Sequence, residues 1–72
     1  MTTINRKALI ETILTRLPPL PNRQLTPHDV RFSHRPGQQP NWSVAVLGAK
    51  LTELEDVRRD LSDYDLDANG FG

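Results

Sequence analysis

Ser33 and His34 are the residues whose types and spacing most directly suggest chemistry, because a hydroxyl beside an imidazole is the pair used in nucleophilic catalysis. Both lie in Val30–His34, where apolar and polar residues alternate as in a half-buried strand. Successive side chains of a strand point to opposite faces, so these two cannot form a catalytic pair there. His28 lies six residues before His34, which is no simple spacing for metal ligands, and the chain has no cysteine to complete a usual zinc site. We therefore expect no catalytic residues, no metal and no enzymatic activity.

A calcium-loop pattern begins at Asp65. Oxygen-bearing side chains follow at alternate positions, and Gly70 stands at the sixth position, as in the first half of an EF-hand loop. The bidentate glutamate of such a loop belongs six residues after Gly70, beyond the last residue of this sequence, Gly72. We therefore expect residues 65–72 to be an acidic, flexible tail, and we expect no cofactor.

The segment Leu17–Arg23 matches the proline-rich ligands of SH3 domains, which place two apolar-proline pairs and a terminal arginine on a polyproline helix. Two interpretations are open, a ligand and the end of a helix. We favour the helix end, because Leu17 and Leu20 are needed as core contacts where the chain leaves a helix.

Two strands and two helices are expected to position these residues. Apolar and polar residues alternate in Trp42–Leu47 as they do in Val30–His34, and the turn-rich link Arg35–Pro40 is short enough to join two antiparallel strands as a hairpin. Asn5–Leu17 carries an apolar stripe of helical period, with Thr3 or Asn5 as its cap. A second stripe, beginning with a candidate capping box, predicts a helix over Leu51–Tyr64.

These elements predict a small α+β domain over residues 1–64, in the order helix, strand, strand, helix, with two helices packed on an antiparallel β-hairpin. The expected core consists of Leu9, Ile13, Leu14, Leu17, Val30, Phe32, Trp42, Val44, Val46, Leu54, Val57, Leu61 and Tyr64.

The charges are distributed unevenly although the net charge of the 72 residues is zero. Residues 1–50 contain seven arginines and lysines and two acidic residues, and residues 51–72 contain the reverse, giving +5 and −5. The two halves can complement each other within one fold or between two copies packed head to tail.

Neither a signal peptide nor a membrane segment is indicated. Charged Arg6 and Lys7 follow a short polar start, and the longest uninterrupted apolar run, Val44–Leu47, is far too short to span a bilayer. We expect a cytoplasmic protein that does not contact membranes.

The sequence favours a non-enzymatic module that binds a protein partner or itself. A core this small often gains stability from association, and a homodimer through the strand edge at residues 42–47 is one such form. No small-molecule substrate is indicated, since a two-layer domain of this length seldom encloses a pocket. The candidate interaction surface consists of Arg23, Arg31, His34, Arg35, Gln38, Ser43 and Ala45.

The alternative function is a nucleic-acid-associated accessory protein. Its basic patch, on the first strand and the link that follows, would comprise Arg31, Arg35, His34 and Arg23. Phe32 and Trp42 would be the aromatic residues that stack on bases. The aromatic residues are better explained as core, so we rank this function second.

Overall fold

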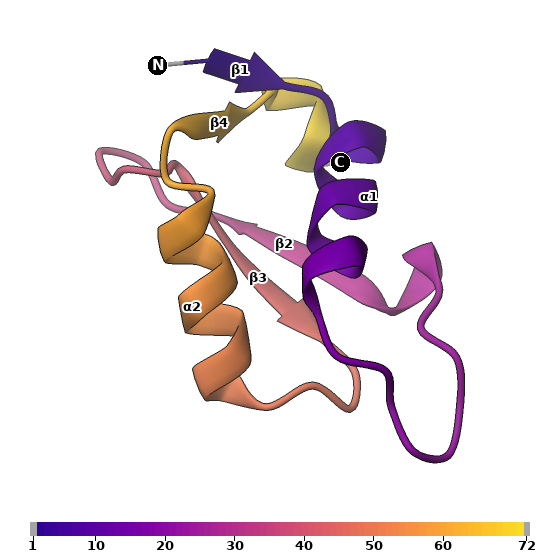
Figure 1. Cartoon of the computed structure of the whole chain (residues 1–72). Helices are drawn as coiled ribbons and strands as arrows, with labels where there is room; N and C mark the ends of the chain where they lie inside the picture. Colours follow the sequence, from indigo (N-terminus) through magenta and orange to yellow (C-terminus); the bar gives the residue numbers. More distant parts are fainter. Residues whose placement is uncertain (1, 72) are drawn as a thin grey trace.

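The computed structural model describes residues 2–71 and has an α+β architecture (Figure 1). Its helices and strands occur in an order that adds one short strand at each end of the predicted helix-strand-strand-helix series. The elements are β1 (Thr2–Ile4), α1 (Arg6–Arg16), the 3-10 helix η1 (Pro27–Asp29), β2 (Val30–His34), β3 (Trp42–Val46), α2 (Leu51–Asp60), β4 (Tyr64–Leu66) and the 3-10 helix η2 (Ala68–Phe71).

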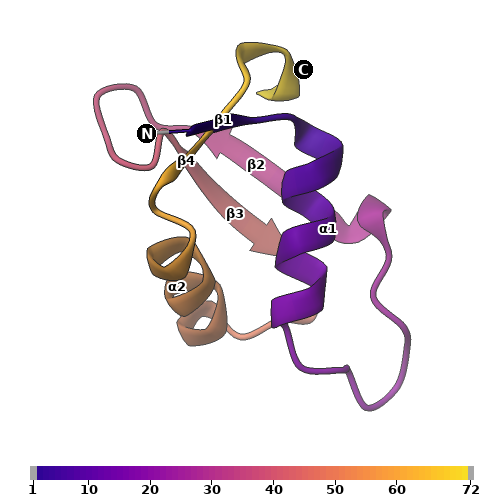
Figure 2. The ribbon, with the colours of Figure 1, turned by 45° about the horizontal axis from the view of Figure 1, so that its top comes forward.

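Strands β2 and β3 form an antiparallel hairpin. Val30 pairs with Val46, and the register continues to His34 opposite Trp42. Both strands lie where the alternation of apolar and polar residues predicts them, except that β3 ends one residue early, at Val46. The two helices lie on the same face of this hairpin (Figures 1 and 2), so the other face is left uncovered by them.

Helix α1 begins and ends as the sequence predicts. The side chain of Asn5 accepts a hydrogen bond from the backbone N–H of Ala8 at 2.8 Å, which satisfies one of the unpaired donors of the first turn. The helix ends before Pro18, because proline has no N–H and its ring clashes with a preceding helical turn.

Helix α2 is shorter than predicted. It ends at Asp60, and its cap is Lys50, so the capping box expected at Thr52 lies inside the helix and does not form. Tyr64 was expected in the helix and in the core, and both expectations are wrong: Tyr64 begins β4 and its side chain is 37% exposed. The chain leaves the helix here because the following residues pair with β1.

Strands β1 and β4 form a parallel pair that the sequence did not indicate. Thr2 pairs with Tyr64, and Ile4 pairs with Leu66. Figures 1 and 2 show both strands at the end of the molecule where β4 follows α2 and β1 leads into α1. Leu66 is only 2% exposed, Gly70 is buried and Phe71 packs against the core, so these residues of the segment expected as a flexible tail contact the rest of the chain.

Asn41 and Trp42 join the two sheets. The Asn41 side chain accepts a hydrogen bond from the N–H of Leu66 at 2.8 Å and donates one to its carbonyl oxygen at 3.1 Å. The indole N–H of Trp42 donates to the carbonyl oxygen of Tyr64 at 2.9 Å. These three bonds occupy the edge of β4 opposite β1, much as a neighbouring strand would.

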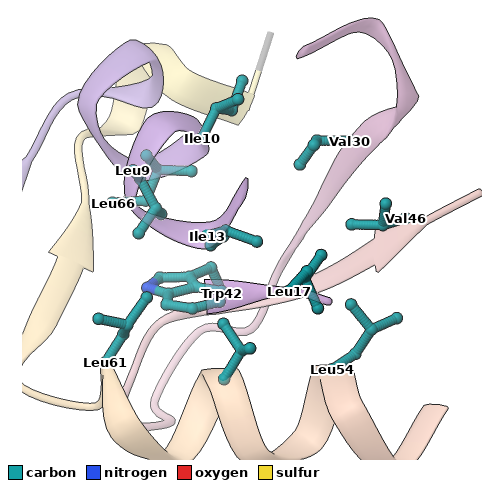
Figure 3. Packing of buried hydrophobic residues seen from close by; sticks show 11 residues of the cluster. Leu9, Ile10, Ile13, Leu17, Val30, Trp42, Val46, Leu54, Leu61 and Leu66 are labelled. Carbon is teal, nitrogen blue, oxygen red and sulfur yellow. The ribbon is translucent and has the colours of Figure 1, made fainter. Parts of the chain in front are cut away.

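The core lies between the two helices and the hairpin, with Trp42 fully buried at its centre (Figure 3). Nine of the predicted core residues are buried, and Leu14, Phe32 and Val44 are half-buried beside them. Ile10 and Leu66 complete the cluster. The buried residues are Leu9, Ile10, Ile13, Leu17, Val30, Trp42, Val46, Leu54, Val57, Leu61 and Leu66.

Leu66→Ala should lower the free energy of unfolding by about 2–5 kcal/mol, the usual cost of truncating a buried leucine. Tyr64→Ala should cost much less, because the hydrogen bond from Trp42 goes to the Tyr64 backbone and the ring is partly exposed. Urea denaturation followed by tryptophan fluorescence measures both. Equal costs for the two variants would mean that β4 is not anchored through Leu66.

Asn41→Ala should lower the free energy of unfolding by about 1–3 kcal/mol, since it leaves the N–H and carbonyl of buried Leu66 without their partner. Asn22→Ala, in an exposed loop, is the control and should change stability by no more than about 0.5 kcal/mol. An Asn41→Ala variant with the wild-type denaturation midpoint would show that water replaces the side chain at no cost.

Candidate interaction surface

The face of the hairpin that points away from the helices carries small and basic side chains. Arg31 pairs with Ala45 and Ser33 pairs with Ser43, so these four side chains lie side by side on it. Leu47 continues the alternation of β3 one residue beyond the strand. We call Arg31, Ser33, Arg35, Ser43, Ala45 and Leu47 the outer hairpin face.

Two leucines at this face are unusually exposed. Leu47 is 70% exposed and Leu51, the first residue of α2, is 71% exposed. Each lines a hollow that is open to solvent, of about 440 Å³ for Leu47 and about 330 Å³ for Leu51, and Ala45 lines both hollows. The two leucines therefore flank Ala45 on one continuous surface.

Polar contacts hold the two arginines at the rim of this surface. Arg35 donates from Nε to the hydroxyl of Ser43 at 3.0 Å, and Arg31 donates from Nη1 to the carbonyl oxygens of His28 and Val30 at 2.8 and 3.2 Å. These contacts fix the direction of each side chain while using only one nitrogen of each guanidinium group.

The edge of β3, where pairing with a second copy was expected, is partly occupied: the carbonyl oxygen of Val46 accepts from the N–H of Ala49 at 3.0 Å, and that of Trp42 accepts from α2. Helix α2 packs along β3, and its Arg58 donates from Nε to the carbonyl oxygen of Trp42 at 2.7 Å. Nη2 of Arg58 also reaches the carbonyl oxygen of Pro40 at 2.9 Å and the side chain of Gln38 at 3.2 Å. Arg58 is therefore half-buried against this edge, although it is a charged residue of a helix.

Three of the seven predicted surface residues lie away from the outer hairpin face. His34 stacks on Phe71, with ring centroids 4.6 Å apart. Arg23 forms an ion pair with Asp29 at 2.9 Å and also donates to the carbonyl oxygen of Leu47. Gln38 lies in the hairpin loop and accepts from Arg58. The structure thus brings together Arg31, Arg35, Ser43 and Ala45, and sequence reasoning missed Leu47 and Leu51 because leucine is ordinarily a core residue.

Ser33 and His34 are exposed, and the strand directs their side chains to opposite faces. Among residues 2–71, no group of three histidine or acidic side chains is arranged to hold a metal ion. In the calcium-like segment, Asp65 accepts a hydrogen bond from the N–H of Asn41 at 3.2 Å. Asp67 accepts one from the N–H of Asn69 at 3.1 Å. Both carboxylates therefore serve as backbone acceptors in the packed chain.

The proline-rich segment is exposed at Pro18, Pro19 and Pro21, but Leu17 is buried in the core and Arg23 is held by Asp29. An SH3 ligand needs both its leucine-proline pairs and its arginine accessible at once. In the folded chain this segment is arranged as the connection from α1 to η1. Within residues 2–71, no helix has the length and apolar character to cross a membrane.

No family model matches this chain, and no curated protein or solved structure matches it either. Its function is therefore inferred from the surface itself.

The pKa of Asp29 lies below its ordinary value, chiefly because the backbone N–H of Thr26 donates to its carboxylate at 3.0 Å. The hydrogen bond from Arg23, at 2.9 Å, and that from the Thr26 hydroxyl, at 3.1 Å, act in the same direction, and partial burial opposes them. The folded state therefore favours the ionised carboxylate more than the unfolded chain does.

This contribution to stability should be fully present above about pH 4, the ordinary pKa range of aspartate, and should be lost as the pH falls through the lower pKa of the folded state. In the variant Asp29→Asn, the free energy of unfolding should decrease less steeply as the pH falls through that range. NMR titration of the wild-type carboxyl carbon should give a pKa below the ordinary value, and Arg23→Gln should raise it only in part, because the Thr26 contacts remain. An ordinary pKa for wild-type Asp29 would contradict this assignment.

Proposed function

We propose that this protein is a small interaction module that binds a protein partner through the outer hairpin face together with Leu51. The observation that carries the proposal is the pair of leucines, Leu47 and Leu51, each about 70% exposed on either side of Ala45. Burying a leucine side chain stabilises by roughly 1.5–3 kcal/mol. A partner that covers both leucines therefore gains a hydrophobic contribution that the chain does not use in its own fold.

The surroundings of the leucines suit a protein partner. Ala45, Ser33 and Ser43 are small, so an approaching surface can reach the strands closely. Arg31 and Arg35 stand at the rim with unused guanidinium N–H groups. Protein–protein contact surfaces usually combine exposed apolar residues with arginines, and this surface contains both.

The face of the hairpin supports the proposal better than the strand edge at residues 42–47. Main-chain pairing along that edge requires its carbonyl groups, and Arg58 and the N–H of Ala49 already bond those of Trp42 and Val46. A strand added there would have to replace these two hydrogen bonds. The outer hairpin face requires no rearrangement.

Nucleic-acid binding is the weaker alternative. Arg31 and Arg35 could contact phosphates, but the rings that would stack on bases are not presented on this face. Trp42 is fully buried, and Phe32 is half-buried beneath the guanidinium of Arg6, which lies 5.6 Å from its ring centre.

A photo-crosslinking amino acid placed at Ser33 should form covalent adducts with protein in living cells, because Ser33 lies exposed at the centre of the outer hairpin face. The same group at Thr15, exposed on α1, is the matched control and should give few adducts. Adding Leu47→Asp and Leu51→Asp should reduce the Ser33 adducts about tenfold or more, equivalent to at least about 1.4 kcal/mol of binding free energy.

The control measurements decide between the candidate functions. Circular dichroism should show that the leucine variants remain folded, since both side chains are largely exposed in the wild type. Equal adduct yields from Ser33 and Thr15, or yields that do not respond to the leucine variants, would contradict the proposal. If nuclease treatment abolished the adducts, the result would support nucleic-acid binding instead.

A further inference from the structure

We infer that Arg23 is a positioning residue for partner binding: it holds the backbone of the exposed Leu47 in place without contacting the partner itself. The inference rests on the proposed function of the outer hairpin face, to which Leu47 belongs. It assigns a role to a residue that lies away from that face, and to the proline-rich segment Leu17–Arg23 in which it occurs.

Leu47 is held by its backbone. It lies one residue beyond β3 and is 70% exposed, so packing of its side chain contributes little to its placement. The N–H of Leu47 donates to the carbonyl oxygen of Asp29 at 3.2 Å, and the carbonyl oxygen of Leu47 accepts from Nη2 of Arg23. Both peptide groups that flank its Cα are therefore hydrogen-bonded, and these bonds set the direction in which the side chain leaves the backbone.

Arg23 connects two strand ends through different nitrogens of one planar group. Nη1 donates to the carboxylate of Asp29 at 2.9 Å, just before β2, while Nη2 donates to Leu47, just after β3. The same carboxylate accepts from the N–H and the hydroxyl of Thr26, at 3.0 and 3.1 Å. Because the guanidinium fork is rigid, a carboxylate that fixes one nitrogen also fixes the direction of the other. Arg23 is thereby aimed at the carbonyl group of Leu47.

A second residue of the proline-rich segment contacts the same turn. The side chain of Leu20 lies against Gly48, where a Cβ would come within 3.0 Å of its Cδ1 and 3.5 Å of Nη2 of Arg23. Leu20 and Arg23 therefore both pack on the turn that follows β3. The leucine and the arginine that give this segment its likeness to an SH3 ligand are engaged in the folded chain with the backbone beside Leu47.

Fixing Leu47 before binding increases affinity, because a residue that is ordered only on binding loses conformational freedom at that moment. For one residue the effect is roughly three- to tenfold in affinity. Arg23 itself does not line the hollow at Leu47; it lines a separate one with Leu20 and Leu25. Its contribution to binding therefore passes through Leu47.

Hydrogen exchange followed by NMR tests the positioning without a partner. In Arg23→Gln, the N–H of Leu47 should exchange at least about fivefold faster, because the turn has lost one of its bonds to a charged group. Arg23→Lys should have the same effect, since lysine has a single nitrogen and cannot donate to Asp29 and Leu47 from two positions. The N–H of Leu61, which is bonded at the end of α2, should keep its rate in both variants. An unchanged exchange rate of Leu47 in Arg23→Gln would overturn the inference.

Arg16→Gln is the matched control. The side chain of Arg16 is 45% exposed, close to the 38% of Arg23, and it also forms an ion pair, with Asp60 at 3.7 Å. Losing this ion pair should leave the exchange of Leu47 unchanged. A rise equal to that in Arg23→Gln would mean that the loss of any surface arginine loosens the turn, and it would contradict a specific role for Arg23.

Photo-crosslinking at Ser33 tests the consequence for binding. Arg23→Gln should reduce the adducts roughly three- to tenfold. The same substitution in a Leu47→Ala chain should cause no further loss, because the side chain that Arg23 positions is then absent, and Leu51 remains to support measurable adducts. A further loss in the Leu47→Ala chain would show that Arg23 contacts the partner directly, which would overturn its role as a positioning residue.

The measurements separate this inference from the function on which it rests. Adducts that require Leu47 and Leu51 but are unchanged in Arg23→Gln would overturn the role of Arg23 and leave the outer hairpin face as an interaction surface. Adducts that do not respond to the leucine variants would overturn the function of the face itself, whatever the exchange rate of Leu47.

Discussion

The hydrogen bonds of Asn41 and Trp42 to β4 are the interactions on which the rest of the structure depends. Strands β1 and β4 pair over only three residues each, and a two-stranded sheet of this size is marginal in water. The Asn41 amide satisfies both backbone groups of Leu66, and the Trp42 indole satisfies the carbonyl of Tyr64. A buried tryptophan also needs a hydrogen-bond acceptor for its indole N–H, and the carbonyl oxygen of Tyr64 provides it. Two weak sheets thereby become parts of one domain.

Arg58 extends this connection to α2. It donates to the backbone carbonyls of Pro40 and Trp42, on either side of Asn41, so helix and hairpin loop are held by the same short segment. The helices cover one face of the hairpin, and α2 covers the edge of β3. The outer hairpin face is the part of this sheet that the helices leave uncovered.

The sequence predicted the elements that are stabilised by local patterns. Alternation placed β2 and β3, and the helical stripe with Asn5 placed α1, because burial of one face imposes a period that can be read from neighbouring residues. It could not place β1 and β4. Thr2 and Thr3 carry no apolar pattern, and their partners Tyr64 and Asp65 lie about sixty residues away, so only the folded chain brings them together. The role of Arg58 cannot be recognised from the sequence for a related reason: a charged residue on a helix is normally solvated, and nothing local shows that three oxygen acceptors lie around it.

The sequence predicts which side chains of the candidate surface point away from the core, but it does not reveal the two exposed leucines beside them. Alternation correctly directs Arg31, Ser33, Ser43 and Ala45 away from the core, since Val30, Trp42 and Val46 must face it. Leu47 and Leu51 could not be recognised, because a leucine at the end of a strand and another at the start of a helix are ordinarily drawn into the core. The turn at Gly48, whose φ of 91° suits glycine, separates them from it. An exposed leucine alone is common, but Leu47 and Leu51 both lie near Ala45, so the exposed apolar area is concentrated on one side of the molecule.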